Sequence, residues 1–192
     1  MKKKAVVIIT ALMCGGMGIA NASDTLQNTA SIGYAFSHIK DYGNLNGVNF
    51  SYRYEFSPEW GVLGSFTWAT ASKSEHSGSV DEGLYKYDSK LNYYSILAGP
   101  VYRINDFVSL YGQIGLGYIK AKGSESDTFR DYYDKDTFSL SKTGIAYGAG
   151  IQFNPVQNVA LTVGYEGATF NSVDDSRNVN PNGFNVSVGY SF

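Results

Sequence analysis

The last nine residues, 184–192, alternate apolar with polar or small side chains along their whole length. A strand points successive side chains to opposite faces, so this segment has one apolar and one polar face. The apolar face carries Phe184, Val186, Val188, Tyr190 and Phe192. Such a strand fits a soluble sandwich, with its apolar face on a core, or a transmembrane barrel, with that face toward lipid. The pattern therefore predicts an all-β protein of one of these two kinds.

Seven earlier segments show the same alternation, at residues 29–39, 47–56, 60–70, 91–104, 107–120, 140–153 and 159–165. The connectors between them alternate in length. Those at 57–59, 105–106 and 154–158 are short, and those at 41–46, 73–90, 121–139 and 171–182 are mostly longer and polar. Outer-membrane barrels have short periplasmic turns and longer extracellular loops, whereas a sandwich has no reason to sort its connectors. We therefore expect an eight-stranded antiparallel transmembrane β-barrel over residues 23–192. Pro100 cannot donate to a strand ladder and predicts a local bulge.

The two ends of the chain favour the same location. Lys2, Lys3 and Lys4 precede an apolar stretch, and residues 20–22 (ANA) place small residues at the two positions that a signal peptidase inspects. The stretch is short and broken by glycines, so we expect a cleaved signal peptide at 1–22 and not a membrane helix. A lipoprotein signal around Cys14 is the rival interpretation, but Met13 stands where a small residue is expected. The C-terminal Phe192 is typical of bacterial outer-membrane barrels.

Composition excludes several kinds of chemistry. Cys14 is the only cysteine, so its removal with the signal peptide excludes disulfides, thiol catalysis and cysteine-based metal sites. Loss of the three leading lysines leaves 12 basic against 17 acidic residues, which gives no basic surface for nucleic acid. The 16 tyrosines and 22 glycines fit a barrel with aromatic belts at the membrane interfaces and tight packing inside. No cofactor is expected.

Six motifs carry a resemblance to a known family. They are 31–35 (SIGYA), 52–55 (YRYE), 60–66 (WGVLGSF), 98–105 (AGPVYRIN), 108–112 (VSLYG) and 146–155 (AYGAGIQFNP). Together they resemble the Ail/OmpX/Lom family of outer-membrane proteins, strand by strand over the predicted barrel. The ending 189–192 (GYSF) departs from the family, which usually has Arg before the final Phe. The resemblance implies a non-enzymatic surface protein with a role in adhesion, invasion or complement resistance.

Charged residues on the polar faces of the strands are candidates for a lumen network. These are Arg53, Glu55, Arg103 and Glu166, with Lys142, Tyr93, Tyr111 and Gln113 on or near the same faces. Buried charges must be paired or hydrogen-bonded, and an eight-stranded barrel is just wide enough for side chains to fill it. A network of ion pairs and hydrogen bonds is therefore expected, in preference to an ion path.

The second and third long connectors hold the candidate ligand-binding residues, because they combine tyrosine with charge. These are Tyr85, Tyr87, Phe129, Arg130, Tyr132, Tyr133 and Lys135. Two weaker motifs lie in the same connectors. Residues 74–77 (SEHS) supply hydroxyl, carboxylate and imidazole, but adjacent residues do not easily hold a catalytic triad. Asp131, Asp134 and Asp136 supply oxygen ligands at spacings that could take calcium, but the stretch lacks the glycine and the distal glutamate of an EF-hand. Neither a catalytic nor a metal site is expected.

All eight lysines that follow the signal peptide fall in or beside the long connectors. The cost of placing lysine in a membrane does not explain why the lysines are also missing from the short-turn side. Their position therefore suggests pairing with lipopolysaccharide phosphates outside the cell, through Lys120, Lys122 and Lys142. Two functions therefore stay open for a monomeric barrel in the outer membrane. One is binding of a host cell, matrix or complement-related molecule by the loops. The other is a structural role with lipopolysaccharide as the main partner, and a loop-borne hydrolase ranks far behind both.

Overall fold

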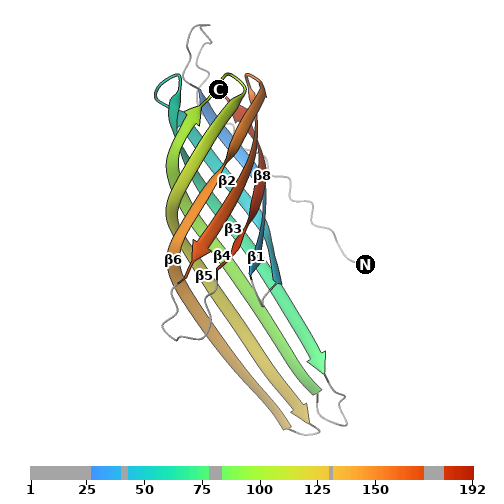
Figure 1. Ribbon diagram of the computed structural model, residues 1–192. Coiled ribbons are helices and arrows are strands. Elements are labelled where there is room, and N and C mark those ends of the chain that lie inside the picture. Colours follow the sequence, from blue (N-terminus) through green and yellow to red (C-terminus); the bar gives the residue numbers. More distant parts are fainter. Residues whose placement is uncertain (1–26, 40–42, 78–83, 130–131, 171–179) are drawn as a thin grey trace, which may run out of the picture.

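A computed structural model describes residues 27–39, 43–77, 84–129, 132–170 and 180–192 of the chain. The predicted signal peptide lies outside these residues. Eight strands are present: β1 (Asn28–Ile39), β2 (Gly43–Glu55), β3 (Trp60–Ser77), β4 (Leu84–Arg103), β5 (Val108–Phe129), β6 (Tyr132–Val156), β7 (Val159–Thr169) and β8 (Asn182–Ser191). Each pairs antiparallel with its neighbours in the chain, and β8 pairs with β1 to close a barrel (Figure 1). The predicted fold class is confirmed.

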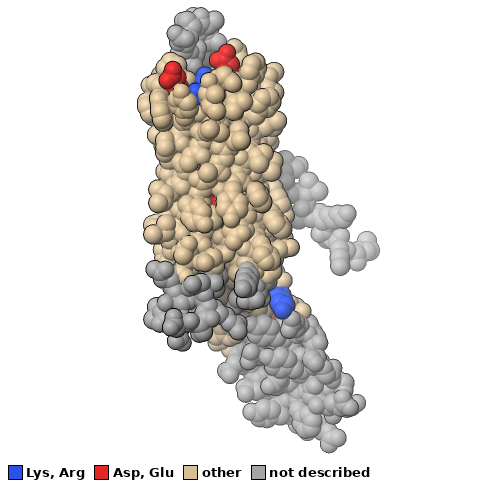
Figure 2. All heavy atoms as spheres, in the orientation of Figure 1, with Lys and Arg blue, Asp and Glu red and all other residues tan. Residues whose placement is uncertain are grey.

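The alternation of side chains explains why the sheet closes as it does. Ile96 is 67% exposed while the next residue, Leu97, is 2% exposed, because one points outward and the other into the barrel. Large apolar side chains such as Ile114 and Val186 cover the outer wall. On the face drawn in Figure 2 the wall is almost free of charged side chains between its two ends. An apolar band of this kind is the surface that faces lipid in a transmembrane barrel.

The connectors sort by length along the barrel axis. The short β2–β3, β4–β5 and β6–β7 turns lie at the end that holds the C-terminus (Figure 1). In the β4–β5 turn, Asn105 Oδ1 accepts hydrogen bonds from the backbone N–H groups of Phe107 and Val108, both at 2.9 Å. This side-chain contact is the usual way in which asparagine stabilises a tight turn. At the opposite end β2 begins at Gly43, whose φ of 99° lies in the left-handed region that favours glycine.

The predicted second and third loops differ most from the structure. Strands β3 and β4 stay paired up to Ser77↔Tyr85, and β5 and β6 up to Phe129↔Tyr132. Most of the residues assigned to loops at 73–90 and 121–139 are therefore strand residues in two long hairpins (Figure 1). Both faces of these segments carry polar residues, so no alternation of polarity marked them as strands. The backbone hydrogen bonds of a ladder do not require an apolar face.

The bulge predicted at Pro100 is wrong. The β4–β5 ladder lapses at Gly99 and Pro100 and resumes at Val101↔Tyr111 in the same register as Ala98↔Ile114. Proline has no N–H to donate, and the ladder accommodates the loss without an inserted residue. A register shift occurs instead between Phe153 and Val156, beside the β6–β7 turn.

In Figure 1 no helix interrupts the strands, and none of the described residues forms a helix long and apolar enough to cross a bilayer.

Candidate functional site

Strands β3, β4, β5 and β6 continue well beyond the rest of the barrel at the end away from the short turns (Figure 1). The β2–β3 ladder ends at Asn46↔Thr70, and the β6–β7 ladder ends at Ile145↔Thr169. Past these points the four strands pair only with one another. We call this four-stranded extension the protruding sheet. It comprises residues 71–77 of β3, 84–92 of β4, 120–129 of β5 and 132–144 of β6.

Both margins of the protruding sheet are open edges in the described part of the chain. Residues 71–77 pair with β4 alone, and residues 132–143 pair with β5 alone. The edge of β6 is the longer of the two. An open edge presents unpaired backbone N–H and C=O groups, to which a further strand can add.

The structure brings most of the predicted ligand-binding residues into this sheet. Tyr85 and Tyr87 lie in β4, at register positions opposite Asp127 and Glu125 of β5. Phe129 and Tyr132 are register partners at the end of the β5–β6 hairpin, followed by the pair Thr128↔Tyr133. Lys135 is opposite Ser126. The register gives the place of each residue's backbone along its strand. Arg130 lies outside the described residues. The candidate residues share one sheet, which the sequence did not predict.

The predicted lipopolysaccharide contacts fall on two different faces. Lys120 and Lys122 lie on the outer face of β5, just beyond Tyr118 and its cross-strand neighbour Tyr94. Lys142 is opposite Ile119, which is buried inside the barrel, so it lies on the inner face. A shift of one position along a strand reverses the face, so spacing in the sequence could not group these three lysines.

Sequence reasoning did not select Lys90 as a contact, although the structure places it directly opposite Lys122 on the outer face. Lys120 lies on the same face in the next row, opposite Asn92. Like charges directly opposite each other in a sheet are destabilising. The three lysines therefore form a concentrated positive patch beside the aromatic belt. Only the register between β4 and β5 reveals it.

Inside the barrel, three of the predicted charged residues form one ion-pair cluster. Glu55 Oε1 lies 2.8 Å from Nη2 of Arg53 and 2.5 Å from Nη2 of Arg103. Arg53 also donates to Ser109 Oγ at 3.0 Å. Arg53 and Glu55 are buried, while Arg103 is 26% exposed at the short-turn end. Glu55 thus pairs with one guanidinium group from its own strand, β2, and with one from β4, two strands away.

Glu166 belongs to a second network made by different residues. Its Oε1 accepts hydrogen bonds from Tyr93 at 2.8 Å and from Ser95 at 2.5 Å, and its Oε2 accepts from Thr67 at 2.8 Å. Thr67 in turn accepts from Asn49 at 2.9 Å. Three hydroxyl donors thus satisfy a buried carboxylate, as burial of a charge requires. Thr67 and Ser95 are the members that the sequence did not indicate.

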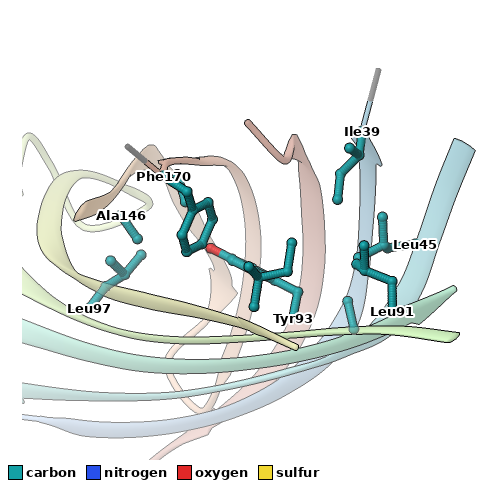
Figure 3. Packing of buried hydrophobic residues seen from close by; sticks show 10 residues of the cluster. Ile39, Leu45, Leu91, Tyr93, Leu97, Ala146 and Phe170 are labelled. Carbon is teal, nitrogen blue, oxygen red and sulfur yellow. The ribbon is translucent and has the colours of Figure 1, made fainter. Parts of the chain in front are cut away.

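The other end of the lumen is apolar. Ile39, Leu45, Leu91, Ile119 and Phe170 are buried near the base of the protruding sheet and pack in one cluster with Tyr93 and Leu97 (Figure 3). The rings of Tyr93 and Phe170 meet edge to face, with centroids 6.4 Å apart. This cluster lies between the Glu166 network and the side of the protruding sheet. The lumen thus holds two polar networks and this apolar cluster.

The catalytic side chains of the 74–77 motif, Glu75 and His76, lie outside the described residues. Ser74 donates its hydroxyl hydrogen to Asp88 Oδ1 on the adjacent strand at 2.5 Å. The side chains of Asp134 and Asp136, and all of Asp131, lie outside the described residues. Among the side chains that are described, no cluster of His, Cys, Asp and Glu could hold a metal ion.

Known proteins resemble this chain over its whole length. A sequence profile described as enterobacterial Ail/Lom protein matches residues 1–192. The virulence membrane protein PagC of Salmonella typhimurium is 37% identical, over 98% of this chain and 100% of its own length. The attachment invasion locus protein of Yersinia pseudotuberculosis is 38% identical, over 98% and 97%. Outer membrane protein X of Escherichia coli is 40% identical, over 98% and 99%.

Solved structures agree with these relatives. The crystal structure of Ail, the attachment invasion locus protein of Yersinia pestis, is 39% identical with a TM-score of 0.67, over 87% of this chain and 99% of that one. The same protein has been solved in complex with the heparin analogue sucrose octasulfate. The names of these relatives are those of membrane, attachment and outer-membrane proteins, and none denotes an enzyme. The chain is an outer-membrane β-barrel that belongs to the Ail/Lom family.

Proposed function

We propose that this protein binds host cell, matrix or complement-related molecules outside the bacterium, and that the protruding sheet makes the contact. The observation that carries the proposal is the sheet itself, in which four strands extend past the barrel and whose two edge strands have no further strand partner among the described residues. A barrel buried in the membrane offers an outside partner only what extends beyond it. Functional residues on a rigid scaffold usually lie in such extensions.

The chemistry of the sheet supports binding rather than catalysis. Tyr85, Tyr87, Phe129, Tyr132 and Tyr133 all occupy it, and aromatic residues supply large contact areas at low entropic cost. Open edges add backbone hydrogen-bonding groups, which bind extended segments of other proteins. The names of the Yersinia relatives, which refer to attachment and invasion, point in the same direction.

Deletion of residues 129–136 tests the proposal. Attachment to cultured cells or capture of serum proteins should fall, while the unheated protein keeps the fast gel mobility of a closed barrel. Replacing Tyr132 and Tyr133 with Ala should reproduce much of the loss, since aromatic hot spots contribute about 2 kcal/mol or more. The matched control replaces both with Phe, which keeps the ring area and should retain most of the binding. Unchanged attachment by the deletion strain would refute the proposal.

A second candidate function is anchorage in lipopolysaccharide, and the opposed pair Lys90↔Lys122 favours it. Phosphate groups placed between these lysines and Lys120 would relieve their repulsion. The double variant Lys90→Gln with Lys122→Gln should therefore lower the melting temperature in vesicles that contain lipopolysaccharide, and not in pure phospholipid. Lys142→Gln, on the inner face, is the control. Equal effects in both kinds of vesicle would remove this candidate.

A further inference from the structure

The inner face of β6 carries two exposed apolar side chains that are followed by a cation. Phe138, Leu140 and Lys142 occupy successive positions on this face, and we call them the inner patch. Phe138 is 47% and Leu140 57% exposed, although Ile119 on the same face of β5 is buried. This face points toward the axis of the barrel and not toward the surrounding lipid. The inner patch therefore offers apolar surface to water, beside a positive charge.

The inner patch continues the apolar cluster of the lumen. Leu140 is opposite Ala121, which packs against that cluster. Phe138 is opposite Gly123, and its ring lies so closely over the glycine that a side chain there would collide with it. An apolar chain laid along the patch would contact Phe138 and Leu140 and border the cluster shown in Figure 3. Removal of this surface from water would stabilise the bound chain.

Lys142 supplies the charged end of the inner patch. Its side chain is half-buried, and none of the ion pairs in the described part of the chain involves it. A charge that is partly removed from water is costly unless it is paired. A carboxylate placed beside Lys142 would supply the missing partner.

The two ends of the inner patch differ in charge. Beyond Phe138 the next register pair is Glu125↔Asp136, so acidic residues follow the apolar end. An anionic group is therefore attracted at the Lys142 end and repelled at the other end. A strand rises about 3.3 Å per residue, which places Phe138 about 13 Å from Lys142 along β6. The patch thus fits a molecule that has one anionic head and an apolar chain of similar length.

We propose that the inner patch binds the anion of a free fatty acid, with the carboxylate on Lys142 and the hydrocarbon chain over Leu140 and Phe138. Lipids of the membrane surround the outer wall and do not reach this face, whereas a dissolved fatty acid does. This binding is separate from attachment to a host. Deletion of residues 129–136, which tests the proposed function, leaves all three residues of the inner patch in place.

The test uses the full barrel in phospholipid nanodiscs, with isotope-labelled leucine methyl groups, and decanoate as the probe. The methyl signals of Leu140 should shift and saturate as decanoate is added. Those of Leu116, on the lipid-facing wall, should report only the decanoate that enters the bilayer and should not saturate. Decyltrimethylammonium has the same chain and a cationic head, and it should bind at Leu140 about fivefold more weakly.

Variants of the barrel separate binding at the inner patch from general partition into the nanodisc. Lys142→Gln should weaken the binding of decanoate about twofold to fivefold, the range of an exposed ion pair. The matched control Lys122→Gln, on the outer face, should leave it unchanged. Phe138→Ser should weaken binding about tenfold through lost apolar contact. The fast mobility of the unheated protein checks the folding of every variant.

Three outcomes would overturn the inference. One is a Leu140 signal that does not saturate with decanoate, and another is an affinity that Lys142→Gln does not change. The third is a dimer of the parent without decanoate that Phe138→Ser dissolves, because a second copy would then cover the inner patch. None of these bears on the proposed function, which fails only if attachment survives deletion of residues 129–136.

Discussion

At the scale of single residues, the buried charges of the lumen belong to two separate networks, one around Glu55 and one around Glu166. The alternation assigned Arg53, Glu55, Arg103 and Glu166 to the inner face, and the structure places all four there. The alternation could not predict that Glu55 forms ion pairs with both Arg53 and Arg103. Nor could it predict that Glu166 accepts hydrogen bonds from hydroxyl groups of β3 and β4. Apart from the Arg53–Glu55 pair within β2, these contacts join strands that are not neighbours, and face assignment does not determine them.

Replacement of Glu166 should be costly for folding. Glu166→Ala leaves the hydroxyl groups of Thr67, Tyr93 and Ser95 without their acceptor. Each buried unsatisfied group costs about 1–3 kcal/mol, so we expect a loss of about 3 kcal/mol or more. Tyr93→Phe removes a single hydrogen bond and should cost about 1 kcal/mol. Urea unfolding in lipid vesicles, followed by tryptophan fluorescence, measures both.

The control for this series is Glu59→Gln in the exposed β2–β3 turn, which should change the free energy of unfolding by less than about 0.5 kcal/mol. If Glu166→Ala unfolds at the same urea concentration as this control, the hydrogen bonds around Glu166 contribute nothing measurable and the network is not a stabilising element.

At the scale of strands and hairpins, sequence periodicity located every strand of the membrane wall but not the protruding sheet. Residues 121–129 and 132–139 are polar on both faces, and the same is true of much of 73–90. A strand with two polar faces has the same polarity pattern as a loop. The polar composition and the length of these segments therefore led to their prediction as loops. The β3–β4 and β5–β6 ladders depend on backbone pairing that no periodicity in the sequence reports.

Hydrogen exchange distinguishes a hairpin from a loop directly. Backbone amides of residues 121–128 that bond across the β5–β6 ladder should exchange at least about tenfold more slowly than the amide of Asp106 in the β4–β5 turn. Solution NMR of the deuterated protein in nanodiscs gives both rates. Exchange as fast as in the turn would mean that the third connector is a loop after all.

At the scale of the whole molecule, a closed barrel carries the protruding sheet on one side of its rim (Figure 1). The ion-pair cluster around Glu55, the Glu166 network and the apolar cluster around Phe170 follow one another along the lumen. An eight-stranded barrel is just wide enough for side chains to fill. We therefore expect no steady single-channel current in planar bilayers at any moderate voltage. Currents above those of a protein-free detergent control would show that the lumen is open.

In the proposed function the barrel serves as a scaffold and the protruding sheet binds the partner. Both hairpins can be cut at a register pair, by replacing residues 74–88 and residues 123–138 each with the two-residue turn Asn-Gly. These cuts join Lys73 to Ser89 and Lys122 to Ser139, which are already cross-strand partners. The shortened protein should still enter the outer membrane and keep its heat-dependent gel shift.

Attachment to host cells by bacteria that display equal amounts of the parent or the shortened barrel is the decisive measurement. We expect bacteria with the shortened barrel to attach no better than a strain without the protein. Attachment equal to that of the parent would contradict it, because the wall of the barrel and its rim would then suffice for binding.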